Sequence, residues 1–133
     1  MNAEFLNDLK CKYIKDAGGS TLIELTAELL FQHDSFPQII VPLGFRCDFA
    51  SVPRLPIVFV LWGDRAHRAA VVHDYLYRTN PSLELTRKQA DIIFRDAMIC
   101  TGAPWKVYWP MYLAVRAAGW FAWHKNKIDA TMS

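Results

Sequence analysis

The chain has 133 residues, of which 53% are hydrophobic and 14% aromatic, so it can bury a core of its own without disulfides. Its formal net charge of +2 is too small to indicate a nucleic-acid-binding surface. Its three cysteines show no zinc-binding spacing, and the first residues lack the apolar stretch of a signal peptide. We therefore expect one cytoplasmically made domain over residues 1–133, with reduced thiols.

The first third of the chain has β-strand composition. Residues 12–15 and 21–31 are rich in Thr, Ile and Leu, and the turn-forming residues 16–20 between them predict a hairpin. Residues 39–41 predict a further strand, and residues 1–10 are expected to form a short arm. These elements predict a small N-terminal antiparallel sheet.

A proline-rich loop follows, from Pro42 to Pro56, in which long helices are excluded. A loop of this length in a small domain is often functional. Asp48 and Ser51 lie three residues apart, which suits a side-chain-capped turn. The functional alternative puts Asp48 beside His73, as a cation ligand or a substrate-orienting acceptor. Ser51 is a weaker candidate nucleophile, because no glycine elbow surrounds it.

Three helices are expected after the loop, so the fold class is α+β, with residues 1–60 as sheet and loop and 64–125 as the helical part. Asp64 is a candidate cap for a helix at about residues 65–78. Thr86 and Gln89 predict a capping box at the start of a second helix, and Gly102 is placed to end it.

The last helix is expected at about residues 105–125, where the sequence is almost continuously apolar. Pro110 is predicted to mark its start. A membrane span is disfavoured because Arg116 lies near the centre of the stretch. We interpret the segment as a core helix. The alternative is an interfacial or partner-facing helix, because its aromatic residues outnumber those that one helix usually buries.

The candidate site combines two of the expected helices. His73 and Tyr77 lie four residues apart and therefore share a helix face, and Asp91 lies at the edge of the buried stripe of the next helix. A carboxylate that holds one ring nitrogen of His73 would allow the other to take a proton from water. Tyr77 would hold the carboxylate, and Asp74 would bind a divalent cation such as calcium.

A structural interpretation stands beside this one. His73 and Asp91 would then form a buried pair that locks two helices together. Asp74 with Arg78, and Asp91 with Arg95, would be ordinary helix ion pairs.

A weaker metal hypothesis involves His67, seven residues before Asp74 and near the same helix face. Together with Asp48 the two would form a site similar to that of metal-dependent His-Asp phosphohydrolases. Those enzymes need further ligands on later helices, and of the remaining histidines only His124 follows.

The motifs His73-Asp74-x-x-Tyr77 and Ala90-Asp91-x-x-Phe94 resemble the catalytic helix pair of secretory phospholipases that cleave the sn-2 ester. The resemblance covers about residues 69–98 and implies that His73 is the base, Asp74 the calcium ligand, and Asp91 and Tyr77 the residues that orient the base. The chain departs from those enzymes in lacking their G-x-G calcium loop and their disulfides.

A second resemblance covers more of the chain. Residues 41–54, VPLGFRCDFASVPR, are similar to the loop P-x-G-F-x-T-D-x-A-S-x-P-R of an uncharacterised phage and prophage family, with Cys47 in place of Thr. The family's H-D-x-L-Y-R and A-D-x-x-F motifs follow at residues 73–78 and 90–94. The resemblance implies a phage origin, includes Ser51 and Arg54 among the candidate site residues, and implies no particular activity.

Two classes of function are therefore expected. The first is a hydrolase that acts on a lipid or cell-envelope ester or amide. The second is a non-enzymatic virion or tail component that binds other phage proteins or an envelope component. In that class the aromatic C-terminal helix makes the contact, with a partner protein or at a membrane interface. Either protein would be made in the host cytoplasm, with possible incorporation into the virion.

Overall fold

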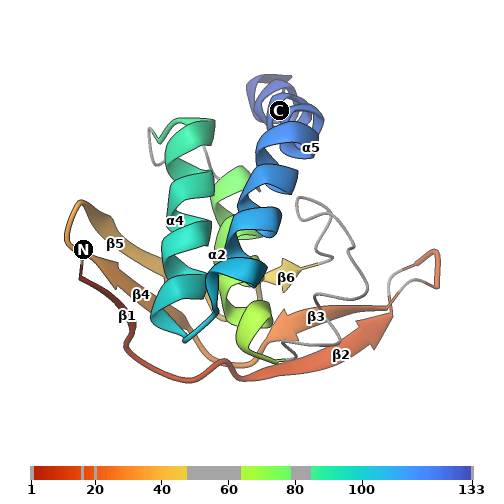
Figure 1. Ribbon diagram of the computed structural model, residues 1–133. Coiled ribbons are helices and arrows are strands. Elements are labelled where there is room, and N and C mark those ends of the chain that lie inside the picture. The colour runs from red at the N-terminus through yellow and green to blue at the C-terminus, as the bar shows by residue number, and fades with distance from the viewer. Residues whose placement is uncertain (1, 16, 20, 48–63, 79–84, 133) are drawn as a thin grey trace. The chain divides into compact units, whose positions relative to one another are not determined.

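The computed structural model describes residues 2–15, 17–19, 21–47, 64–78 and 85–132. The chain divides into two compact units, Met1–Asp48 and Phe49–Ser133. The described part of the first unit contains strands, and that of the second contains three helices, which confirms the expected α+β class (Figure 1). That the two units form a single domain stays a prediction.

The strands form two three-stranded antiparallel sheets. In one sheet β4 (Leu29–His33) lies between β1 (Ala3–Phe5) and β5 (Phe36–Val41). In the other, β3 (Thr21–Leu25) lies between β2 (Cys11–Lys15) and β6 (Arg46–Cys47). The buried residues of this unit alternate along the strands, as expected for sheets with one covered face. They are His33 and the hydrophobic residues Ile23, Leu25, Leu29, Phe31, Ile39, Val41 and Cys47.

The first unit differs from expectation in three places. Residues 1–10 are not an arm throughout, because Ala3–Phe5 pairs with β4. The strand predicted over 21–31 is two strands in different sheets, interrupted after Leu25, where the Thr26 N–H donates to the carbonyl of Lys10. The short strand β6 lies inside the stretch expected to be irregular, after a turn at Gly44 with φ of +87°. These pairings are long-range, and local composition does not report them.

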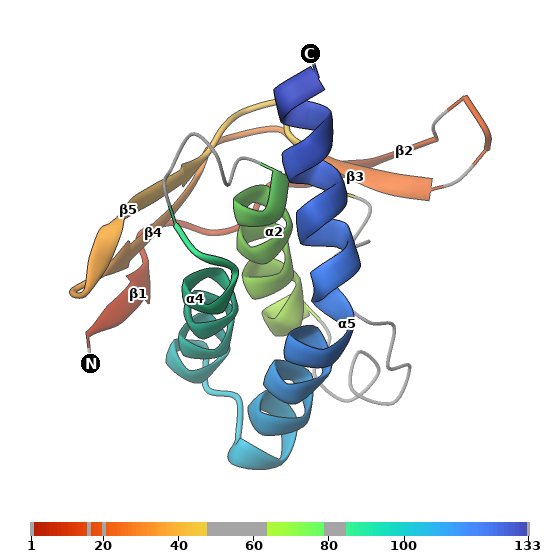
Figure 2. The same cartoon turned by 90° about the horizontal axis from the view of Figure 1, so that it is seen from above.

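The helical unit contains α2 (Asp64–Arg78), α4 (Arg87–Cys100) and α5 (Trp105–Met132), each packed against the other two. The colour gradient of Figure 1 shows that α4 runs antiparallel to α2 and α5, and Figure 2 shows the three side by side. The capping box at Thr86 is confirmed, with the Gln89 N–H donating to Oγ1 and the Thr86 N–H donating to Gln89.

Helix α5 corrects two expectations. It begins at Trp105 and continues through Pro110, which therefore does not mark its start, and it extends to Met132. Pro110 removes one backbone hydrogen bond in the second turn. Buried Val107, Met111 and Val115 on the side that faces the other helices compensate for this loss. Gly102, with φ of +94°, ends α4 as predicted. No helix in the described part of the chain is both long and apolar enough to span a membrane.

Candidate functional site: a buried ionic cluster between three helices

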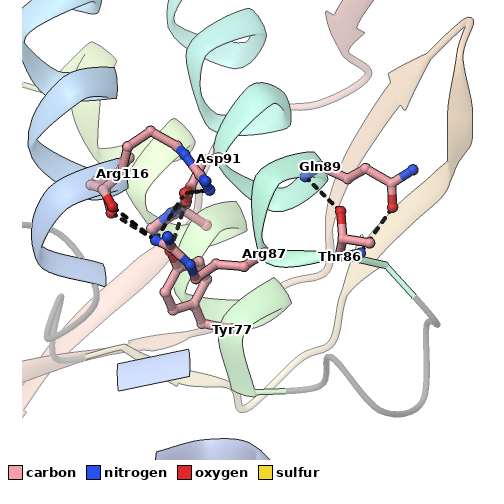
Figure 3. Close-up of polar contacts among 8 residues, drawn as sticks. Tyr77, Thr86, Arg87, Gln89, Asp91 and Arg116 are labelled. Atoms are coloured by element: carbon pink, nitrogen blue, oxygen red, sulfur yellow. Dashed lines mark hydrogen bonds and ion pairs between the residues drawn. The ribbon is translucent and has the colours of Figure 1, made fainter. Parts of the chain in front are cut away.

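Asp91 is the centre of a polar cluster in the helical unit (Figure 3). Its Oδ1 lies 2.7 Å from His73 Nε2 and accepts a hydrogen bond of 2.7 Å from the Tyr77 hydroxyl. Its Oδ2 accepts a hydrogen bond of 2.9 Å from Arg116 Nη1 and lies 3.5 Å from Arg87 Nη1. We call these five residues the Asp91 cluster. It joins all three helices through one carboxylate.

Helical spacing explains how the cluster is assembled. His73 and Tyr77 lie one turn apart on α2, and Arg87 and Asp91 lie one turn apart on α4, so each pair presents its side chains on one face. Arg87 also donates to the carbonyl of Arg116, at 3.1 Å, and thereby connects α4 to the backbone of α5 (Figure 3).

Aromatic rings surround the imidazole of His73. Its ring centroid lies 4.3 Å from that of Tyr77 and 4.7 Å from that of Phe94. Trp123 packs edge-on against Tyr77, with centroids 5.2 Å apart. The side chains of His73, Tyr77 and Asp91 are all 0% exposed. The contacts expected among these three residues are present, but the imidazole does not reach solvent in this structure. Their catalytic roles stay predictions.

Burial and hydrogen bonding act in opposite directions on Asp91. Burial alone would raise the pKa of its carboxyl, but hydrogen bonds from His73, Tyr77 and Arg116 and the attraction of His73 outweigh burial and hold the pKa below its ordinary value. Burial and the neighbouring negative charge of Asp91 raise the pKa of Tyr77. Asp91 is therefore ionised and Tyr77 protonated. Because a carboxylate only accepts, we assign a hydrogen to His73 Nε2.

The charges of the cluster favour an ionised Asp91. Arg116 Nη1 and Arg87 Nη1 place two positive charges 2.9 Å and 3.5 Å from its Oδ2. Their attraction offsets the cost of burying a carboxylate.

The other predicted site residues are distributed as follows. Asp74 is 2% exposed, and its Oδ2 lies 3.3 Å from Nη2 of Arg78, which confirms that ion pair. Within the described ranges, no three His, Cys, Asp or Glu side chains come together in a way that could hold a metal ion. Asp48, Ser51 and Arg54, and the side chain of His67, lie outside the described residues.

The expected ion pair between Asp91 and Arg95 is wrong. Arg95 Nε donates to Asp96 Oδ1 at 3.2 Å. The ion-pair partner of Asp91 on its own helix is instead Arg87, one turn before it. The sequence interpretation overlooked Arg87 and Arg116 as members of the site. A signal was available for Arg116, because an arginine in an almost continuously apolar helix needs a buried carboxylate as partner.

A comparison with protein families places most of the chain in a known family. A family model described as "Protein of unknown function (DUF1353)" matches residues 23–115. The matched region includes His73, Tyr77, Arg87 and Asp91 and ends one residue before Arg116. No curated protein and no solved structure matches the chain.

Proposed function

We propose that this chain, which belongs to the DUF1353 family of proteins of unknown function, is a non-enzymatic phage or prophage component in which the Asp91 cluster holds the helical unit together. One observation carries this proposal: His73, Tyr77 and Asp91 are completely buried. A general base must reach the water that it deprotonates, whereas a structural pair has no such need.

The hydrogen bonds of Asp91 support the same proposal. Oδ1 has its hydrogen-bond partners on α2, and Oδ2 accepts from Arg116 of α5 and lies within ion-pair distance of Arg87 of α4. A buried carboxylate that lost these donors would carry a large desolvation penalty, so each donor is needed for stability. The cluster thereby favours one arrangement of the three helices.

The proposed phage origin has its support in the loop of residues 41–54, which is similar to the loop of a phage and prophage family. We accordingly propose synthesis in the host cytoplasm, incorporation into the virion or its tail, and contact with other phage structural proteins or an envelope component.

The test compares two variants of His73. His73→Ala removes the donor to Asp91 and is expected to lower the free energy of unfolding by about 1–3 kcal/mol. His73→Gln places an amide N–H near the position of Nε2 and should recover part of this loss, although it cannot act as a base. Urea denaturation gives both values. In parallel, the wild-type protein is incubated with a fluorogenic phospholipid ester.

No turnover is expected from the wild-type protein. The proposal is overturned if the wild-type protein hydrolyses the ester, both variants abolish turnover and neither loses stability. Lys88→Gln, at an exposed side chain of α4 outside the Asp91 cluster, is the control. It should leave stability within about 0.5 kcal/mol of the wild-type value.

The second candidate function is a hydrolase, and the orientation of His73 favours it. Asp91 contacts the imidazole at Nε2, as in a dyad in which a carboxylate fixes the tautomer, and the Tyr77 hydroxyl donates to the same carboxylate oxygen. Nδ1 would take a proton from water while the resulting hydroxide attacks the carbonyl carbon of a lipid or cell-envelope ester or amide. The leaving alcohol or amine would take that proton from Nδ1. The pocket would have to open for water to enter.

A divalent cation would distinguish the two candidates further. In the hydrolase, calcium bound at Asp74 would raise the melting temperature, and Asp74→Asn would abolish that rise. In the non-enzymatic protein, Asp74 is occupied by Arg78 and calcium should leave the melting temperature unchanged. Magnesium at the same concentration controls for ionic strength.

A further inference from the structure

Helix α5 has a second apolar face that the helical unit does not cover. Four of its large side chains are exposed: Trp105 by 62%, Trp109 by 42%, Leu113 by 60% and Trp120 by 56%. They follow one another at intervals of four, four and seven residues, and at 100° per residue they fall within an arc of about 80°. We call these four residues the aromatic face.

The opposite side of α5 already supplies the core. Val107, Met111 and Val115 are buried, and they lie on the side of the helix away from Leu113. The aromatic face is therefore additional to what the fold needs. Large aromatic side chains that gather on one exposed helix face are typical of a binding surface.

Cationic groups accompany the indole rings. Lys106 Nζ lies 5.8 Å from the Trp105 ring, and the guanidinium of Arg95, which also pairs with Asp96, lies 5.7 Å from the Trp109 ring. The ring of His124 lies 4.3 Å from that of Trp120.

The amino-acid sequence of this segment also has an excess of positive charge. No Asp or Glu occurs between Asp96 and Asp129, and the same stretch contains the basic residues Lys106, Arg116, Lys125 and Lys127. Arg116 is engaged with Asp91, whereas Lys106 is exposed beside Trp105. The complement of this stretch is therefore a negatively charged surface that also accepts apolar side chains.

We propose that the aromatic face binds the surface of a membrane containing anionic phospholipids, with α5 lying parallel to the bilayer. Indole rings favour the headgroup level, where the ring is buried and its N–H remains hydrated, and Leu113 would reach the acyl boundary. Lys106, beside Trp105, would contact lipid phosphates. A second copy of the chain is a poorer occupant, because its own α5 would bring like charges together.

This proposal deepens the proposed function, because it rests on the proposed contact with an envelope component. It involves no residue of the Asp91 cluster, so its failure can be distinguished from failure of the structural role of that cluster. The experiment is co-sedimentation of the full chain with vesicles of phosphatidylcholine alone, or of phosphatidylcholine and phosphatidylglycerol in equal parts. The variant Trp105→Ser/Leu113→Ser/Trp120→Ser removes three exposed side chains of the aromatic face. Tyr13→Ser is the matched control, since Tyr13 is an exposed aromatic residue on β2.

We expect the wild-type protein and Tyr13→Ser to sediment with the anionic vesicles, and added sodium chloride to weaken their binding. The triple variant should bind at least about tenfold more weakly, because it removes three large apolar side chains from the surface that binding would bury. Its melting temperature should be unchanged. Equal sedimentation of the triple variant, or no sedimentation of the wild-type protein, overturns the proposal. Self-association of the wild-type protein that the triple variant lacks would assign the face to a second copy instead.

Discussion

Asp91 has four donor groups around one carboxylate, and a substitution there tests the cluster most directly. Asp91→Asn keeps the shape of the side chain but removes its charge, so Arg87 and Arg116 lose their common partner. We expect the free energy of unfolding to fall by about 3–5 kcal/mol, the range for a broken buried ion pair, in urea denaturation.

Glu24→Gln is the matched control for this substitution. Glu24 also has two cationic partners, Lys12 and Arg46, but their side chains are 59% and 63% exposed. Water screens such pairs, so the control should lose much less stability than Asp91→Asn. Equal losses in the two variants would contradict a special role for burial.

The ionisation of Asp91 also makes the free energy of unfolding depend on pH in the acid range. Its pKa in the folded protein lies below the ordinary value of 3.8 because the hydrogen bonds from His73, Tyr77 and Arg116 outweigh burial. The unfolded chain therefore binds a proton more readily than the folded chain, and the stabilisation is present above pH 3.8 and lost as the pH falls through the folded value.

The direction of this pKa shift can be tested by comparing the pH dependence of stability in the wild-type protein and in Asp91→Asn. The difference in unfolding free energy between the wild-type protein and Asp91→Asn should be largest near neutral pH and should shrink as the pH falls below 3.8. Chemical denaturation at a series of pH values gives the difference. A difference that stays constant down to low pH would show that Asp91 is not ionised in the folded protein.

At the scale of the element, the start of α4 is fixed by the reciprocal hydrogen bonds of Thr86 and Gln89. Thr86→Ala removes the acceptor for the Gln89 N–H and should cost about 1 kcal/mol in urea denaturation. Thr86→Ser retains a hydroxyl and should stay close to the wild-type value. If Ala and Ser were equivalent, the capping box would contribute nothing measurable.

The elements also show what local sequence can predict. Helices α2 and α4 were predictable because their apolar spacing and capping residues lie within a few positions of each other. The continuation of α5 through Pro110 was not, because packing of Met111 and Val115 decides it. The same limit applies to β1, whose strand character comes from pairing with β4, more than twenty residues away.

At the scale of the whole molecule, the α+β class could be read from the order of strand-like and helix-like segments. The contacts of His73 with Asp91 and of Tyr77 with Asp91 were also predictable, because a short connection between two helices favours antiparallel packing. The burial of the pair was not, since it depends on rings such as Phe94 and Trp123 that approach from other elements. Arg116 escaped prediction because its partner lies 25 residues away.

The sharing of one carboxylate by three helices has a consequence for how such a chain can evolve. A fully apolar replacement of a buried ionic cluster is often as stable as the original, yet each single step toward it leaves a charge without its counter-charge. Such a step costs about 3–5 kcal/mol, out of a total stability of about 5–15 kcal/mol for a typical domain. Lineages that inherit Asp91 therefore have few viable single-residue routes away from it, whether or not its imidazole partner ever meets a substrate.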